Sequence, residues 1–119
     1  MMLQNPAVKR GDVILVMFPY SDLVSARVRP ALVVQADGLQ TGISQAIVAM
    51  ISSQLGRTSH PSRVTIRLTS SEGRQSGLLM DSVILTDNLA TVTLSAISRV
   101  IGSLPMSAAD GALRHTLSL

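Results

Sequence analysis

The chain has 119 residues, a formal net charge of +3 at pH 7 and no cysteine. This length fits a single domain spanning residues 1–119, and the lack of cysteine excludes disulfides and thiolate metal sites. Hydrophobic residues make up 46% of the chain and charged residues 14%, which excludes a disordered protein. With so few charged residues, part of the protein surface is expected to be apolar, and a second copy or another partner is predicted to cover it.

Short runs of apolar and β-branched residues, separated by turn residues, follow one another along most of the chain. They predict strands over Asp12–Phe18, Pro30–Gln35, Gln45–Ser52, Arg63–Leu68 and Leu79–Leu85, with shorter candidates near Ala90 and Ser98. Several short strands at this spacing are typical of a small barrel or sandwich.

The last segment has a different pattern. Ser107 stands where a helix N-cap is expected, and Asp110 follows three residues later, which approximates a capping box. Apolar residues then recur at helical spacing, at Ala109, Ala112, Leu113 and Leu117. The sequence therefore predicts a mainly β domain with one C-terminal helix.

The stretch "SARVRPALVV" places two arginines directly before a buried strand. Pro30 lacks an N–H and restricts Arg29 to an extended conformation, so the Arg29 side chain starts from backbone that moves little. One interpretation is a surface arginine whose stem covers apolar residues. The other is a rigidly held guanidinium that stabilises an anion.

Polar residues gather where the third predicted strand ends, in "MISSQLGRTSHPSR". Ser52, Ser53 and Gln54 supply hydroxyl and amide groups, and a basic loop without an acid follows. This is either an ordinary solvated loop or a rim that binds phosphodiesters. The basic loop contains Arg57, His60 and Arg63.

The sequence lacks the usual signatures of other enzymes and of membrane proteins. It contains no glycine-rich phosphate loop, no nucleophile elbow and no close pair of carboxylates. Its two histidines are far apart, so neither a metal nor a cofactor is expected. The longest apolar run is too short to span a bilayer and no secretory signal is recognised, so a cytoplasmic protein is expected.

In order along the chain, four segments resemble the MazF/PemK family of toxin ribonucleases. "GDVILVMFPYSDLVSARVRPALVV" is similar to the opening of that family, where a strand leads through a Phe-Pro turn and a variable basic loop to Arg-Pro-Ala-Leu-Val. "AMISSQ", "GLLMDSVILTDNLATV" and "SRVIGSL" resemble its later strands. Each segment is short, and only the ordered set, from Gly11 to about Leu117, is specific.

The resemblance implies an SH3-like barrel of about five to seven strands that forms a homodimer. It implies a metal-independent endoribonuclease that cleaves single-stranded RNA through its 2′-hydroxyl, and a cognate antitoxin protein. Arg29 takes the place of the arginine that acts at the scissile phosphate, and Ser52 that of the catalytic threonine. The expected substrate-binding residues are Phe18, Tyr20, Arg27, Ser53, Gln54, Arg57, His60 and Arg63.

Two points stay open. The sequence does not identify the group that accepts the 2′-proton, since arginine is a poor base at neutral pH. Moreover, related toxins of the same fold are not enzymes and poison a protein target such as DNA gyrase. The joint presence of Arg29 and Ser52 favours the ribonuclease.

Overall fold

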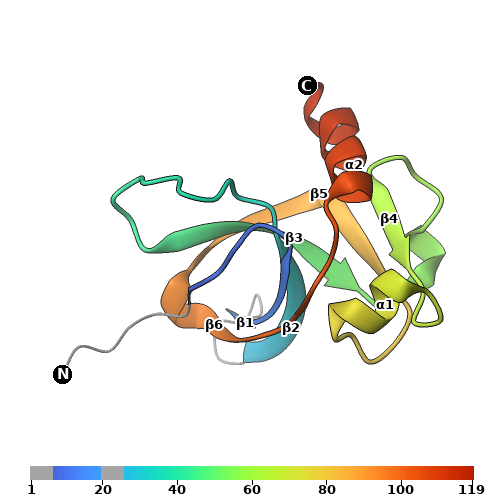
Figure 1. Cartoon of the computed structure of the whole chain (residues 1–119), viewed down its shortest axis with the longest axis horizontal. Helices are drawn as coiled ribbons and strands as arrows, with labels where there is room; N and C mark the ends of the chain where they lie inside the picture. Colours follow the sequence, from blue (N-terminus) through green and yellow to red (C-terminus); the bar gives the residue numbers. More distant parts are fainter. Residues whose placement is uncertain (1–6, 20–25) are drawn as a thin grey trace.

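The computed structural model describes residues 7–19 and 26–119, with the backbone alone for Phe18, Pro19, Ala26 and Arg57 (Figure 1). Its strands are β1 (Asp12–Pro19), β2 (Ala26–Val33), β3 (Gln45–Ser52), β4 (Arg63–Ile66), β5 (Ser82–Thr93) and β6 (Ile97–Ser103). Its helices are α1 (Ser71–Ser76), α2 (Ser107–Leu117) and two short 3₁₀ turns, η1 (Leu55–Arg57) and η2 (Leu94–Ala96). The mainly β prediction with a C-terminal helix is confirmed.

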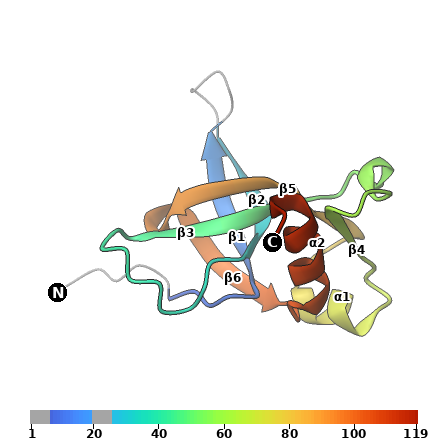
Figure 2. The same cartoon turned by 90° about the horizontal axis from the view of Figure 1, so that it is seen from above.

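The six strands form one antiparallel sheet in the order β4-β5-β3-β2-β1-β6. The sheet is strongly curved, and β5 runs along much of its length (Figures 1 and 2). The first half of β5 pairs with β4 and with the end of β3, and its second half pairs with the start of β3. The name SH3-like barrel stays a prediction.

Several predicted strand limits differ from the observed ones because pairing overrides local signals. The third strand, Gln45–Ser52, is as predicted. The second begins earlier, at Ala26, because residues 26–30 pair with β1. The candidate near Ala90 belongs to β5, which continues through the turn-like residues Asp87 and Asn88 by a register shift against β3.

The core has two clusters on the opposite faces of β1 and β2. Neighbouring residues along a strand go to different clusters: Val13 and Leu32 to the first, Ile14 and Ala31 to the second. All four are fully buried. Because both faces are covered in this part of the strands, residues 13–16 of β1 and 31–33 of β2 are unbroken apolar runs rather than alternating ones.

The C-terminal helix begins differently from the prediction. Ser107 is its first residue, the N-cap is Met106, and that cap makes no side-chain hydrogen bond. Asp110 instead accepts a hydrogen bond from Arg10 at 2.5 Å, so it ties the helix to the start of the first strand. The expected apolar face is buried at Ala109, Ala112 and Leu113, with α2 packed against β4 and β5.

Helix α1 was not expected from the sequence. The hydroxyl of Ser70 caps it by accepting a hydrogen bond from the N–H of Gly73 at 3.0 Å, and Gly77 ends it in the left-handed conformation. The helix contacts β6 and turns the chain back toward β5. No helix in the described ranges is long and apolar enough to cross a membrane.

Candidate functional site

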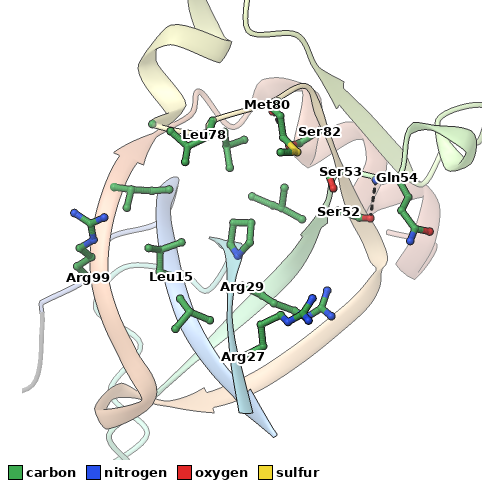
Figure 3. Close-up of a pocket in the computed structure, with 16 residues that line it drawn as sticks. Leu15, Arg27, Arg29, Ser52, Ser53, Gln54, Leu78, Met80, Ser82 and Arg99 are labelled. Atoms are coloured by element: carbon green, nitrogen blue, oxygen red, sulfur yellow. Dashed lines mark hydrogen bonds between the residues drawn. The ribbon is translucent and has the colours of Figure 1, made fainter. Parts of the chain in front are cut away.

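A pocket of about 480 Å³ lies between β2, the end of β3, the segment that joins α1 to β5, and β6 (Figure 3). Its apolar lining includes Leu15, Val28, Ile51, Leu78, Met80 and Ile101. Its polar lining includes Ser52, Ser53, Gln54 and Ser82, and its cationic lining is Arg27, Arg29 and Arg99. The volume is within the range of small-molecule sites, and the mixture of apolar surface with a few charges is typical of them.

The position of Arg29 follows from the unequal pairing of β2. The strand pairs with β1 from Ala26 to Leu32, with Arg29 opposite Val16, but it pairs with β3 only from Ala31 to Val33. The pocket occupies the space where β2 and β3 diverge. Pro30, which also lines the pocket, restricts the backbone of Arg29, and the Arg29 residue is half-buried.

Arg27 lies within the second strand, and not before it as the sequence analysis expects. Arg27 belongs to β2 and is paired with Phe18 across the hairpin. Its side chain is exposed and lines the same pocket as that of Arg29. Both arginines therefore start from ordered strand backbone on one wall.

Ser52 is the last residue of β3, and its side chain shapes the turn that follows. The Ser52 Oγ accepts a hydrogen bond from the backbone N–H of Gln54 at 3.1 Å. This turn places Ser53 and Gln54, both exposed, on the pocket wall beside Ser52. Figure 3 shows the guanidinium groups of Arg27 and Arg29 directed toward this side of the pocket.

Two of the predicted substrate-binding residues, His60 and Arg63, lie outside the pocket lining. Arg63 forms an ion pair with Asp87 of β5 at 2.9 Å, because β4 and β5 are neighbours in the sheet. His60 contacts Ser62 at 2.7 Å, and its ring meets that of His115 edge to face at 5.9 Å between centroids. The expected loop without an acid thus has a carboxylate from a distant strand beside it.

The ion pair between Arg63 and Asp87 stabilises the charged form of the Asp87 carboxylate. The hydrogen bond from Arg63 is the main cause that lowers the pKa of Asp87 below its ordinary value, and partial burial opposes it. The positive charge of Arg63 is therefore partly neutralised within the protein.

Three further predicted residues cannot be assigned to the pocket. Tyr20 lies outside the described residues. Phe18 is paired with Arg27 through the backbone, and Arg57 is the last residue of η1. Their side chains lie outside the description, so their roles stay predictions.

The site also contains residues that the sequence analysis missed. Arg99 of β6, Leu78 and Met80 before β5, and Ser82 in β5 all line the pocket. Only the pairing of β6 with β1, which sets Arg99 opposite Leu15, brings Arg99 to the site. No short motif around Arg99 signals this position, because the contact depends on partners far along the chain.

The described residues of the lining carry positive charge and include no carboxylate. Asp81, between Met80 and Ser82, is directed toward the segment that follows β4 instead. Its carboxylate accepts a hydrogen bond from the backbone N–H of Leu68 at 2.8 Å, which is the main cause that lowers the Asp81 pKa, and it also pairs with Arg67. In the described part of the chain no three His, Cys, Asp or Glu side chains gather as a metal site would require. The pocket suits an anion with an apolar part.

Comparisons with known proteins show which family the chain resembles and which solved structures share its fold. Residues 9–115 match the model of a family described as PemK-like, MazF-like toxin of type II toxin–antitoxin systems. Endoribonuclease EndoA of Bacillus subtilis (strain 168) is 33% identical over 116 residues, which cover 94% of this chain and 96% of that protein.

Solved structures show the same fold at low sequence identity. A mycobacterial endoribonuclease in complex with its cognate antitoxin has a TM-score of 0.75 at 18% identity, covering 95% of this chain and 97% of that chain. The Mycobacterium tuberculosis toxin MazF-mt6 has a TM-score of 0.69 at 21% identity, covering 91% and 97%. A MazE–MazF structure from Deinococcus radiodurans has a TM-score of 0.70 at 16% identity, covering 98% and 99%.

Proposed function

The chain belongs to the family of PemK-like, MazF-like toxins of type II toxin–antitoxin systems, and we propose that it is an endoribonuclease that cleaves single-stranded RNA. One observation carries the proposal beyond the family: Arg29 and Ser52 line a single pocket, and none of the described residues in its lining carries a carboxylate. A phosphodiester would meet a guanidinium and a hydroxyl there.

The proposed reaction uses the nucleophile that RNA itself carries. The 2′-oxygen attacks the adjacent phosphorus, the bond from phosphorus to the 5′-oxygen breaks, and the products end in a 2′,3′-cyclic phosphate and a 5′-hydroxyl. Such a reaction needs alignment, proton transfer and neutralisation of the extra negative charge on phosphorus. Arg29 supplies the neutralisation, so the proposed step needs no metal ion.

Ser52 is proposed to orient the phosphate. Its Oγ already accepts the Gln54 N–H, so its own O–H proton can be donated to a phosphate oxygen. Among the described residues that line the pocket there is no His, Asp, Glu or Lys, and the group that accepts the 2′-proton is left open by this proposal. Arg27, Ser53 and Gln54 are proposed to bind the substrate beside this centre.

The remaining predicted substrate contacts are proposed on the resemblance alone. They are Phe18, Tyr20, Arg57, His60 and Arg63. Because His60 and Arg63 lie outside the lining, any RNA contact that they make is with a part of the strand beyond the pocket.

The alternative, a non-enzymatic toxin that poisons a protein target such as DNA gyrase, is not favoured. The curated relative at 33% identity is named an endoribonuclease. The pocket with Arg29 and Ser52 also gives a ribonuclease a place for its phosphate.

A cognate antitoxin is the proposed protein partner. The mycobacterial structure described above was solved with its cognate antitoxin, and the Deinococcus structure contains MazE with MazF. The cationic pocket fits an acidic segment of such a partner, which would exclude RNA from the same surface. The proposed substrate places this action in the cytoplasm.

We predict that the protein is a homodimer. Several large apolar side chains are exposed on the single chain, among them Leu79 at 91% and Ile43 at 64%. A second copy that covers such side chains would remove them from water. Light scattering at micromolar concentration should give twice the chain mass of 12.6 kDa. A mass of one chain throughout that range would contradict the prediction.

The proposed activity is tested with the purified protein and a mixed-sequence RNA of about 30 nucleotides, in buffer with EDTA. We expect cleavage of the single strand at preferred positions and protection of the same strand once it is annealed to its complement, since pairing holds the bases away from the pocket. The control is a preparation of Arg29→Ala purified in parallel, which identifies contaminating nucleases. An RNA that stays intact, or that is cut equally by both preparations, would contradict the proposal.

A further inference from the structure

We propose that Arg99 binds a second backbone phosphate of the RNA, so that the pocket holds the nucleotide between two phosphates. This inference rests on the proposed ribonuclease function and adds to it a substrate contact on β6. The scissile phosphate lies at Arg29 and Ser52, and the additional phosphate lies at Arg99.

The arrangement of charges in the pocket supports two separate anion contacts. Arg27 and Arg29 lie on β2 near the end of β3, whereas Arg99 lies on β6, on the opposite side of the apolar floor (Figure 3). Leu15 lies between these sides, since its strand pairs with β2 through Pro30 and with β6 through Arg99. Arg27 and Arg29 on β2 are therefore separated from Arg99 on β6 by one intervening strand, β1.

Arg99 has no ion-pair or hydrogen-bond partner for its side chain in the ranges that the structure describes. The residue is exposed and lines the pocket, and the lining residues that the structure describes include no carboxylate. Other basic residues are engaged within the protein: Arg10 with Asp110, Arg63 with Asp87 and Arg67 with Asp81. Arg99 keeps its full charge for a ligand.

The surface between the cationic sides fits the rest of a nucleotide. Leu15 and Leu78 form apolar surface there, and Met80 and Ser82 border it (Figure 3). A base can pack against the apolar side chains while the phosphates on either side of its sugar reach the arginines. Single-stranded nucleic acid commonly binds in this way, with the backbone on cationic groups and the bases on apolar or aromatic surface.

The proposal predicts a change in substrate binding rather than in chemistry. Arg99→Ala should raise KM for a single-stranded RNA with a mapped cleavage site by about 5- to 20-fold and leave kcat within about twofold, as the loss of a charged contact outside the reacting phosphate would. The slope of log KM against log salt should fall by about 0.7, the value for one phosphate contact on a single strand. Arg114→Ala is the matched control, since Arg114 is exposed on α2 and does not line the pocket.

A second measurement locates the phosphate. Methylphosphonate linkages, which remove one phosphate charge at a time, are placed at each position beside the cleavage site. At one position the methylphosphonate should weaken the binding of the RNA to the parent protein. The same linkage should not weaken RNA binding to the Arg99→Ala variant any further, because the linkage and the substitution remove the same contact. If every linkage acts equally on the parent and the variant, or if KM and the salt slope do not change, the proposal is wrong.

Binding of the corresponding 2′-O-methyl RNA, which cannot be cleaved, separates this proposal from the proposed function. A parent protein that binds this RNA through Arg99 but cleaves no RNA would contradict the ribonuclease and support the phosphate contact. If Arg99→Ala binds the RNA normally but loses affinity for a fluorescent oligoglutamate peptide, Arg99 serves an acidic protein segment and the RNA contact is refuted.

Discussion

Arg29→Ala should keep the fold and lose RNA cleavage by a factor of about 10²–10³, the usual effect of removing one group that stabilises transition-state charge. Arg29 lines the pocket and is half-buried, whereas Arg27 and Arg99 are exposed. Pro30 follows it and restricts its backbone, so the position of Arg29 is fixed before the substrate binds. Arg29→Lys should fail as well, because an ammonium does not reproduce the planar, bidentate guanidinium. The measurement is single-turnover cleavage of a mapped RNA, with circular dichroism to confirm folding.

Arg27→Ala is the matched control for that experiment. It removes the same charge from the same strand and the same pocket, but from an exposed residue that lies two positions earlier in β2. Its effect should be a weaker attraction for RNA, seen as a higher KM and a smaller salt dependence, with kcat nearly unchanged. A folded Arg29→Ala protein that cleaves at the parental rate would refute the proposed mechanism.

Gly77→Ala should destabilise the protein by about 3 kcal/mol and lower its melting temperature by about 10 °C. Gly77 has a φ of +74°, in the left-handed region that costs other residues energy. A Cβ there would also lie 2.0 Å from the backbone oxygen of Ile101 in β6. Neither group can yield easily, since one belongs to the cap of α1 and the other to a strand.

Gly111→Ala should stabilise the protein, in contrast to Gly77→Ala. Gly111 lies within α2, and a Cβ added there meets nothing within 4 Å. Alanine has a higher helix propensity than glycine, so this variant should gain about 0.5–1 kcal/mol. Thermal unfolding of both variants beside the parent checks the pair, and equal melting temperatures for Gly77→Ala and the parent would show that α1 and β6 are not held as tightly as described.

The strands that could be predicted from the sequence are those whose local pattern agrees with their final environment. Gln45–Ser52 is an apolar run between polar turns, and it pairs on both sides with neighbouring strands. By contrast, Asp87 and Asn88 have the composition of a turn, yet they lie in β5 because a register shift against β3 accommodates them. Pairing between distant segments decided these limits, and a local pattern does not contain that information.

The candidate site was predictable where one short segment determines it. The sequence Arg29–Pro30 before an apolar strand indicated a rigid guanidinium, and Ser52 was indicated by its place at the end of a strand; both line the pocket. Arg99 could not be predicted, because its place depends on β6 pairing with Leu15 of β1. The Arg63–Asp87 ion pair was missed for the same reason, since Asp87 comes from the neighbouring strand.

The central claim is that the 2′-hydroxyl of the RNA is the nucleophile and that the protein positions and neutralises the phosphate next to it. It is tested most directly with an RNA that carries a single 2′-deoxy nucleotide on the 5′ side of the mapped cleavage site, compared with the unmodified RNA in the presence of EDTA. The account predicts that the unmodified RNA gives a 2′,3′-cyclic phosphate and a 5′-hydroxyl, and that the 2′-deoxy RNA is bound but not cut at that position. Cleavage of the 2′-deoxy RNA at that position, or products with a 5′-phosphate, would contradict it.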